Sequence, residues 1–255
     1  MDYNKEINRI VDFIKEIIDN SKAKGIVIGL SGGIDSATTA ALCTKAIGKD
    51  KMLALIMPCH SLEEDINDAK LVAEHLNIKY IIVNLDKTFD TFISALSPDR
   101  VPNKMAQANL KPRLRMCSLY YYANELNYLV AGTGNKSEDD IGYFTKYGDG
   151  GVDFLPIQHL YKNEVRKIAK LLGIPDKIIN RKPSAGLWKG QTDEDELSSQ
   201  LGFQVTYDKL DEMLQNIHNN NYDPNDPNYQ SLLNLMKKNK HKIQLPPALK
   251  RSAWF

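Results

Sequence analysis

The sequence predicts an α/β fold: a doubly wound parallel sheet with helices on both faces, followed by a helical C-terminal extension. Three observations indicate it. Short β-branched segments alternate with helical segments through the first half of the chain, and the connections between them are short. A glycine-containing turn also joins the first buried strand directly to a helix. The 255 residues are interpreted as one domain, residues 1–255.

Strands are identified by short β-branched runs and helices by apolar residues that recur every three or four positions. The segment KGIVIGL (24–30) shows the strand pattern clearly, because no charge follows Lys24. Strands are expected over 24–30, 52–58, 79–85 and 128–133. Helices are expected over 2–20, from the glycine turn to near Gly48, and over 61–77, 104–127 and 162–172.

Local signals refine some of these elements. Ser61 is the expected N-cap of the helix over 61–77, with Glu64 completing a capping box. Pro112 is expected to start or kink the helix over 104–127, since proline lacks a backbone N–H. Residues 134–161 contain no clear periodic element. The C-terminal extension is expected to hold an acidic helix start (TDEDEL) and helices near 206–218 and 228–240.

Composition excludes several classes of protein. Lys plus Arg is 33 and Asp plus Glu is 32, so the formal charge of +1 gives no overall field for nucleic acid. Cys43, Cys59 and Cys117 form no CxxC pair, which argues against a disulfide framework or structural zinc site. The sequence also lacks an apolar run of roughly 20 residues and a signal-peptide core. We expect a cytoplasmic protein that binds neither nucleic acid nor a membrane.

The segment SGGIDS, residues 31–36, carries the strongest chemical signal. It follows a buried strand and opens a helix, so its backbone N–H groups and the helix dipole can form a nest for phosphate. It matches neither the GxxxxGK[ST] nor the GxGxxG pattern. A carboxylate at Asp35 would repel phosphate unless a cation lay between them, which predicts a Mg²⁺ ligand. The plain alternative is a glycine turn in which Asp35 only balances the helix dipole.

SGGIDS resembles the pyrophosphate loop of the N-type ATP pyrophosphatases, in the adenine nucleotide alpha hydrolase-like superfamily, whose fold is Rossmann-like. Those enzymes cleave ATP between its α- and β-phosphates and transfer AMP to a substrate oxygen. Residues 132–157 (GTGNKSEDDIGYFTKYGDGGVDFLPI) closely resemble the signature of the NAD synthetase family. Further blocks of that family are matched by NLKPRLRM (109–116), KPSAGLWKGQTDEDEL (182–197) and HKIQLPP (241–247). The resemblance covers essentially the whole chain, in order.

The resemblance implies an ammonia-dependent ligase that amidates deamido-NAD to NAD through an acyl-adenylate, releasing AMP and pyrophosphate. It implies that Mg²⁺ is the cofactor, with Asp35 and Glu138 as ligands, and that Asp35, Lys162 and Asp153 are catalytic. The ATP-binding residues would be Gly29, Leu30, Ser31, Gly32, Gly33, Ile34, Asp35, Ser36, Thr133, Lys162 and Ser184. The deamido-NAD-binding residues would be Arg113, Lys146, Asp153, His241 and Lys242.

Some of these residues also stand out without the resemblance. Lys162 begins a helix, where its charge opposes the helix dipole, so another reason for it is expected. Asp149 and Asp153 lie in a glycine-rich loop beyond a parallel strand, and either could be the base for ammonium. The less favoured alternative for this loop is an exposed turn cluster stabilised by Asx hydrogen bonds. Glu138, taken alone, could be an ordinary solvated acid.

Organisation along the chain sharpens the expectation. The NAD synthetase blocks run from about residue 29 to residue 247, so no glutaminase or amidase domain is expected. The nitrogen donor would then be free ammonia, or ammonia supplied by a separate protein. The family is homodimeric, and a homodimer is expected here. A short insertion near 198–205 and Gly186 in place of a common aspartate depart from the family pattern. The alternatives are a tRNA-modifying N-type enzyme and a nucleotide-binding sensor without turnover.

Overall fold

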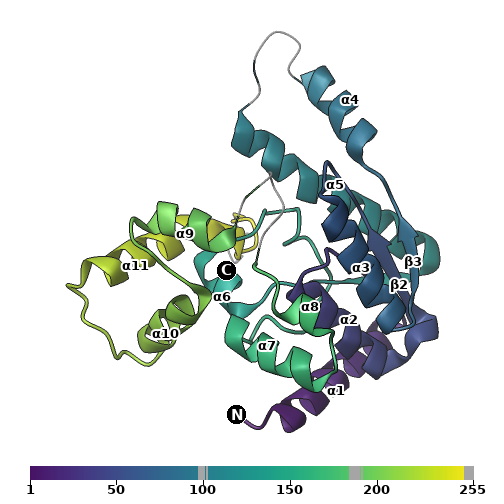
Figure 1. The fold of residues 1–255 in the computed structure, drawn as a ribbon, viewed down its shortest axis with the longest axis horizontal. Helices are drawn as coiled ribbons and strands as arrows, with labels where there is room; N and C mark the ends of the chain where they lie inside the picture. Colours follow the sequence, from purple (N-terminus) through teal and green to yellow (C-terminus); the bar gives the residue numbers. More distant parts are fainter. Residues whose placement is uncertain (97–100, 102, 184–189, 191, 250–255) are drawn as a thin grey trace, which may run out of the picture.

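The computed structural model describes residues 1–96, 101, 103–183, 190 and 192–249. Its centre is a parallel sheet of four strands in the order β3-β2-β1-β4 (Figure 1). The strands are β1 (Gly25–Gly29), β2 (Met52–Ile56), β3 (Lys79–Ile82) and β4 (Tyr128–Ala131). The chain runs outward from β1 to β3 and then returns to place β4 on the other side of β1. The order in which strands are added to the sheet therefore reverses between β1 and β4. This is the position at which ligands bind in such folds.

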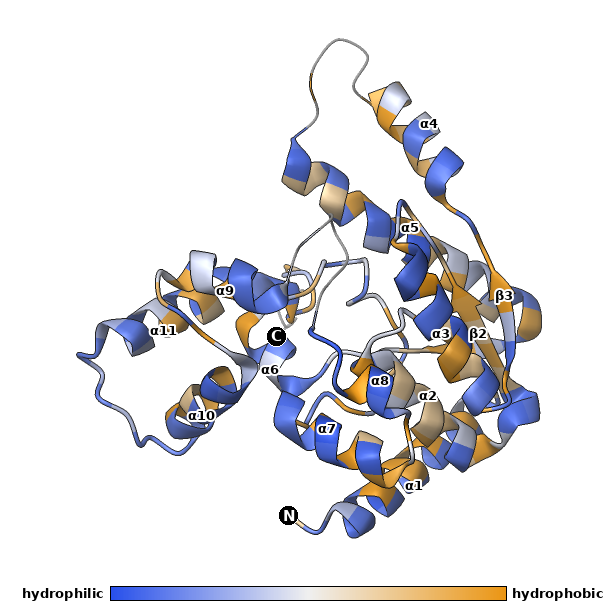
Figure 2. Cartoon of the chain, in the orientation of Figure 1, coloured by the Kyte–Doolittle hydropathy of each residue, from blue (hydrophilic) through white to orange (hydrophobic). Residues whose placement is uncertain are grey.

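The two central strands β1 and β2 are apolar throughout because both faces of the sheet are covered there. Val27, Leu53 and Leu55 pack into one hydrophobic cluster, whereas Ile26 and Ile28 point into another. Figure 2 shows the strands in hydrophobic colours beneath helices whose outer sides are hydrophilic. This arrangement confirms the doubly wound sheet expected from the uninterrupted β-branched runs.

Helices cover the two faces in unequal numbers. One face packs against α1 (Tyr3–Ser21), α2 (Ile34–Ile47), α3 (Glu63–His75), α7 (Lys162–Leu171) and the short α8 (Asp176–Ile179). The other face packs against α4 (Asp86–Leu96) and α5 (Lys104–Leu126). The helices packed on the sheet thus follow the predicted order, with α4 and α8 added.

A helical unit with its own core lies beside the sheet (Figure 1). It consists of α6 (Lys136–Ile141), α9 (Asp193–Leu201), α10 (Tyr207–His218) and α11 (Pro227–Asn239), with the 3₁₀ turn η2 (Lys240–Lys242) after it. Its largest fully buried side chain is Tyr207. The predicted C-terminal extension is confirmed, and α6 joins it although it comes directly after β4. A second 3₁₀ turn, η1 (Lys49–Lys51), precedes β2.

Two local expectations change. Ser61 is not the N-cap of α3, because the helix begins later and Leu62 occupies that position. The Ser61 hydroxyl instead accepts hydrogen bonds from Cys59 N and Arg115 Nη2, at 3.2 and 3.3 Å. Pro112 does not start a helix, since α5 begins at Lys104 and continues past it.

The segment in which an insertion was expected has a defined conformation. It holds the last turn of α9, which Gly202 ends with φ of +80°. The Ser198 hydroxyl then accepts a hydrogen bond from Val205 N at 3.0 Å and so pins the following turn. Within the described residues, no helix is long and apolar enough to cross a membrane.

Candidate active site

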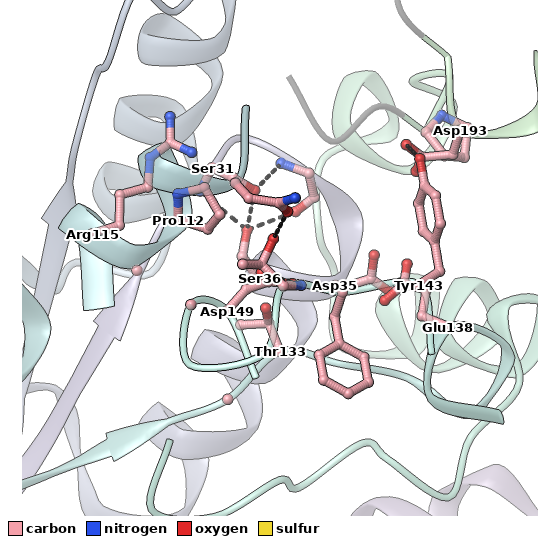
Figure 3. Close-up of a pocket in the computed structure, with 18 of the residues that line it drawn as sticks. Ser31, Asp35, Ser36, Pro112, Arg115, Thr133, Glu138, Tyr143, Asp149 and Asp193 are labelled. Atoms are coloured by element: carbon pink, nitrogen blue, oxygen red, sulfur yellow. Dashed lines mark hydrogen bonds between the residues drawn. The ribbon is translucent and has the colours of Figure 1, made fainter. Parts of the chain in front are cut away.

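A cavity of about 940 Å³ opens at the carboxyl ends of β1 and β4. Figure 3 shows the loop containing Ser31 and Ser36 in the middle of it, with Arg115 from α5 on one side and Tyr143 and Asp193 on the other. The cavity lies between β1 and β4, where the strand order reverses, and this is the place expected for a ligand in this type of fold.

The loop between β1 and α2 is closed by its own hydroxyl groups. Ser31 N and Gly33 N donate to Ser36 Oγ and Ser31 Oγ, at 3.3 and 3.2 Å. Ser36 Oγ in turn donates to Gly33 O at 3.0 Å and lies 3.1 Å from Ser31 Oγ. These bonds hold the loop in the shape of an anion nest at the N-terminus of α2.

Gly32 is required at the tip of this loop for two reasons. Its φ is +80°, a conformation that costs other residues roughly 1–2 kcal/mol. A Cβ atom here would also lie 2.8 Å from both Asp65 O and Asp68 Cβ on α3. The loop is therefore seated directly against α3, and it can approach that helix so closely only because this side chain is absent.

Lys162 joins the two carboxylates that were predicted to bind metal. It is the first residue of α7 and is 2% exposed. Its Nζ lies 2.5 Å from Asp35 Oδ2 and 3.1 Å from Glu138 Oε1. Asp35 lies in the first turn of α2, which follows β1, and Glu138 lies in α6, which follows β4. Because β1 and β4 are neighbours in the sheet, these two helix starts meet. The structure thus assembles Asp35, Glu138 and Lys162 as one buried cluster.

Neighbouring groups fix the direction of each carboxylate. Asn135 Nδ2 donates to Asp35 Oδ1 at 3.0 Å. The Tyr207 hydroxyl donates to Glu138 Oε1 at 3.4 Å, and its ring lies 4.7 Å from Lys162 Nζ, a cation–π contact. The cluster therefore has supporting contacts from both the sheet loops and the C-terminal helical unit.

Burial and charge act in opposite directions in this cluster. Burial alone would lower the pKa of Lys162, but the carboxylates of Asp35 and Glu138 outweigh it and hold the pKa above its usual value. Burial raises the pKa of Glu138 to about 7, with Asp35 adding to the rise and Lys162 opposing it. Lys162 is accordingly a permanent cation whose charge keeps two adjacent acids compatible.

The two carboxylates suit a divalent cation. Their oxygen atoms already converge on a single positive centre, and hard carboxylate oxygens are the ligands that Mg²⁺ prefers. Among the described residues, no cluster of three or more His, Cys, Asp or Glu side chains could hold a metal ion. Any such cation would therefore need ligands from phosphate or water in addition to Asp35 and Glu138.

The other expected ATP contacts lie around the same cavity, as far as the structure describes them. Gly29, Leu30, Ser31, Gly33, Ile34 and Ser36 line it, as does Thr133 after β4. Gly32 instead turns towards α3. Ser184 and Gly186 lie outside the described residues.

Four of the five residues expected at deamido-NAD form a connected group. Arg113 Nη2 donates to Lys146 O at 3.3 Å, and Lys146 Nζ donates to His241 O at 2.6 Å. Lys242 follows His241, lines the cavity, and donates to Gly142 O at 2.7 Å. These cations thus gather at one side of the cavity, although only Lys242 lines it.

Asp153 is placed elsewhere. Its Oδ2 accepts a hydrogen bond from Val130 N of β4 at 2.7 Å, and its Oδ1 accepts one from the Tyr120 hydroxyl at 3.1 Å. It does not line the cavity, whereas Asp149 does. In this structure its carboxylate completes the backbone bonding of β4 and is not brought to Lys162, so its expected role in catalysis stays a prediction.

Several cavity residues were missed by the sequence reasoning. Arg115 lines the cavity, whereas Arg113, two residues before it, is exposed. Arg181 also lines the cavity and forms ion pairs with Asp65 and Asp68 of α3. A buried lysine beside two acids requires supporting polar groups, but no sequence signal indicated which residues would supply them.

Comparisons with known proteins agree with this geometry. Residues 6–246 match the NAD synthase family. The chain is 46% identical over 249 residues to the NH(3)-dependent NAD(+) synthetase of Archaeoglobus fulgidus, covering 97% of each chain. It is similar to the structure of NMN synthetase from Francisella tularensis (TM-score 0.87, 34% identity, covering 99% of this chain and 100% of that one). The NH3-dependent NAD synthetase from Campylobacter jejuni matches with a TM-score of 0.81 and 34% identity, over 98% and 100% of the two chains.

Proposed function

The chain belongs to the NAD synthase family and is an NH3-dependent NAD(+) synthetase, an ATP-dependent ligase; we propose that the cavity between β1 and β4 carries its reaction in two steps. A carboxylate oxygen of deamido-NAD attacks the α-phosphorus of ATP, and pyrophosphate leaves with the electron pair of the broken P–O bond. Ammonia then attacks the carbonyl carbon of the acyl-adenylate, and AMP leaves as NAD forms.

One observation carries this proposal: the phosphate nest of residues 31–36 and the buried Lys162 meet between β1 and β4, where the strand order reverses. The loop of residues 31–36, whose shape its internal hydrogen bonds hold, would receive the phosphates of ATP at the N-terminus of α2. Lys162, which stays charged, would neutralise the charge that develops on departing pyrophosphate. Most of the acceleration would come from positioning and charge, because adenylation needs no covalent bond to the protein.

We propose Mg²⁺ as the cofactor, held by Asp35 and Glu138. The convergence of their oxygens on the Lys162 ammonium supports this, since the same oxygens suit a hard cation. When bound, Mg²⁺ would supply charge neutralisation for the phosphates of ATP. Lys162 would then release one or both carboxylates and become available to a phosphate oxygen.

The second step needs a base, because ammonium must lose a proton before its nitrogen can attack. Asp149 and Asp153 are both candidates, and the structure favours Asp149 because it lines the cavity. Its Oδ1 accepts a hydrogen bond from Thr145 N at 2.9 Å, which fixes its position in the loop. We propose that Asp153 acts on deamido-NAD only through the placement of that loop and of β4.

We propose that the Arg113, Lys146, His241 and Lys242 group receives the anionic phosphates of deamido-NAD. The bonds that join these residues at the edge of the cavity support the assignment. Phosphate groups are bound by such clusters of cationic side chains. Replacing Arg113 with alanine should raise KM for deamido-NAD and leave KM for ATP unchanged.

We further propose a homodimer in the cytoplasm. Exposed apolar side chains on α4 and α5 support the dimer: Phe92 (45% exposed), Leu96 (54%), Met105 (45%) and Tyr121 (64%). Cys43, Cys59 and Cys117 are all free thiols, which suits a reducing compartment. Sedimentation at micromolar concentration should give twice the chain mass of 28.8 kDa, and a monomer mass would contradict the dimer.

The direct test supplies purified protein with ATP, Mg²⁺, ammonium and deamido-NAD. We expect NAD, AMP and pyrophosphate in equal amounts, and the appearance of ADP and phosphate would contradict the proposed cleavage. The similarity to an NMN synthetase structure raises a second candidate, amidation of the corresponding mononucleotide. Comparing kcat/KM for the dinucleotide and the mononucleotide acid decides between them. ATP binding without pyrophosphate release would indicate a nucleotide sensor, and binding of tRNA a tRNA-modifying enzyme.

A further inference from the structure

A buried carboxylate lies directly behind the Lys162 cluster. Asp211, on α10, is 0% exposed and comes from the C-terminal helical unit. Its Oδ1 accepts a hydrogen bond from the Ser137 hydroxyl, and its Oδ2 accepts one from Asn163 N at 3.0 Å. Ser137 Oγ accepts a further bond from Lys162 N at 2.9 Å. Asp211 is thus connected to the first two residues of α7, once directly and once through Ser137.

These bonds supplement the capping of α7, in which Glu164 accepts a hydrogen bond from Tyr161 N at 2.9 Å. The first backbone N–H groups of a helix have no partner within it, and a side chain at the N-cap usually satisfies one of them. Tyr161 occupies that position, makes no such bond, and directs its hydroxyl to His218 Nδ1 at 2.9 Å. The two donors are satisfied from other elements, and the backbone of Lys162 is therefore held by α6 and α10.

The charge of Asp211 also suits this position. The N-terminus of a helix carries a partial positive charge, to which Lys162 adds a full one. A carboxylate placed against the end of α7 offsets both charges from the backbone side. Ser137 precedes Glu138 in α6, so the same carboxylate also secures the element that carries the second acid of the cluster.

We propose that Asp211 is a positioning residue for the synthetase reaction: acting through Ser137, it sets the backbone of Lys162 and so aims the lysine ammonium at Asp35, Glu138 and the phosphates. This inference rests on the proposed role of Lys162. It assigns the helical unit of α9 to α11 a part in building the site, in addition to packing beside it. A reactive group must be held within about 0.5 Å of its working position, and Asp211 provides that support at Lys162.

The test compares Asp211→Asn with Asp208→Asn. Asparagine keeps the size of Asp211 but removes its charge. Its single amide oxygen can accept from Ser137 Oγ or from Asn163 N, so one of the two donors loses its acceptor. Asp208 lies on the same helix, is exposed, and forms an ion pair with Arg166 at 3.1 Å. We expect Asp211→Asn to lower kcat by about 10- to 100-fold, with KM for deamido-NAD changed less than threefold. Asp208→Asn should keep the wild-type kcat.

A double-mutant cycle with Lys162→Met distinguishes an effect of Asp211 through the lysine from an effect on stability alone. All variants are assayed well below their unfolding temperatures. If Asp211 acts through the lysine, Asp211→Asn should lower the residual activity of Lys162→Met by less than threefold. The same 10- to 100-fold loss in both backgrounds would overturn the inference, as would an unchanged kcat in folded Asp211→Asn.

Ser137→Ala provides the same test with a smaller change. It removes the bridging hydroxyl but leaves the bond from Asn163 N to Asp211 in place. If Asp211→Asn does not fold, the cycle between Ser137→Ala and Lys162→Met decides the matter by the same two outcomes. Wild-type activity in Lys162→Met alone would instead contradict the proposed function of that lysine, so the two failures are distinguishable.

Discussion

Replacing Lys162 with methionine should destabilise the protein and create a tighter metal site. Methionine is similar in length but carries no charge, so Asp35 and Glu138 would face each other without their common partner at 2.5 and 3.1 Å. Removing one member of a buried ion pair costs about 3–5 kcal/mol. The carboxylates keep Asn135 and Tyr207 and are 17% and 18% exposed, which favours the lower end of that range.

A loss of about 3 kcal/mol should lower Tm by roughly 6–12 °C in a chain of this size. Without the lysine, a divalent cation can enter between the two carboxylates unopposed. A ligand at 100 times its Kd stabilises by about 2.7 kcal/mol, so Mg²⁺ or Mn²⁺ should restore most of the lost Tm. The wild type, in which Lys162 already fills that position, should respond much less in the absence of ATP.

The assay is thermal unfolding of wild type and Lys162→Met across a metal titration, without nucleotide. Lys167→Met is the control, because it makes the same substitution on the same helix at an exposed position. It should show neither the loss of Tm nor the response to metal. If Lys162→Met has the same Tm as the wild type, or gains no extra stability from metal, the lysine does not occupy the cation position.

Three further predictions address the loop, the acid and the β4 carboxylate. Gly32→Ala should lower the free energy of unfolding by at least about 1–2 kcal/mol and raise KM for ATP, because the residue has positive φ and its Cβ would contact Asp68. The control is Gly202→Ala, which has φ of +80° and open space around it and should lose stability only. Burial raises the pKa of Glu138 from 4.5 to about 7, so the folded protein holds this proton more tightly than the unfolded chain does. The free energy of unfolding should therefore fall as pH rises from about 4.5 to 7, by at most about 1.4 kcal/mol per pH unit. Glu138→Gln should remove that part of the pH profile of the metal-free protein, and an identical profile would contradict it. Asp153→Asn should lower Tm and change kcat less than tenfold; a loss above 100-fold at constant Tm would show that the carboxylate takes part in the chemistry.

Much of the fold could be predicted because the strands have no polar interruption. Ile26, Val27 and Ile28 are all buried, two facing one cluster and one the other, and such runs occur in parallel sheets covered on both sides. The helix α6 could not be found in this way. Its sequence KSEDDI is polar and too short for periodicity, and it is a helix because Asn135 caps it and the C-terminal unit packs against it.

The limits of prediction at the site have a geometrical cause. Arg113 and Arg115 lie on different sides of α5, since residues two apart in a helix do not face the same way. The orientation of α5 against the sheet decides that Arg115 lines the cavity, and the sequence of α5 alone does not contain that orientation. The contact of Lys162 with Asp35, and its connection to Asp211 through Ser137, likewise join elements far apart in the chain.

The central claim is that the acid group of the dinucleotide attacks the α-phosphorus of ATP in this cavity. Deamido-NAD labelled with ¹⁸O in its nicotinate carboxylate tests it most directly, with mass spectrometry of the products after a single turnover. The account predicts one ¹⁸O atom in the phosphate of AMP and none in pyrophosphate, because the carboxylate oxygen leaves with AMP. AMP free of label, or label in pyrophosphate, would contradict it.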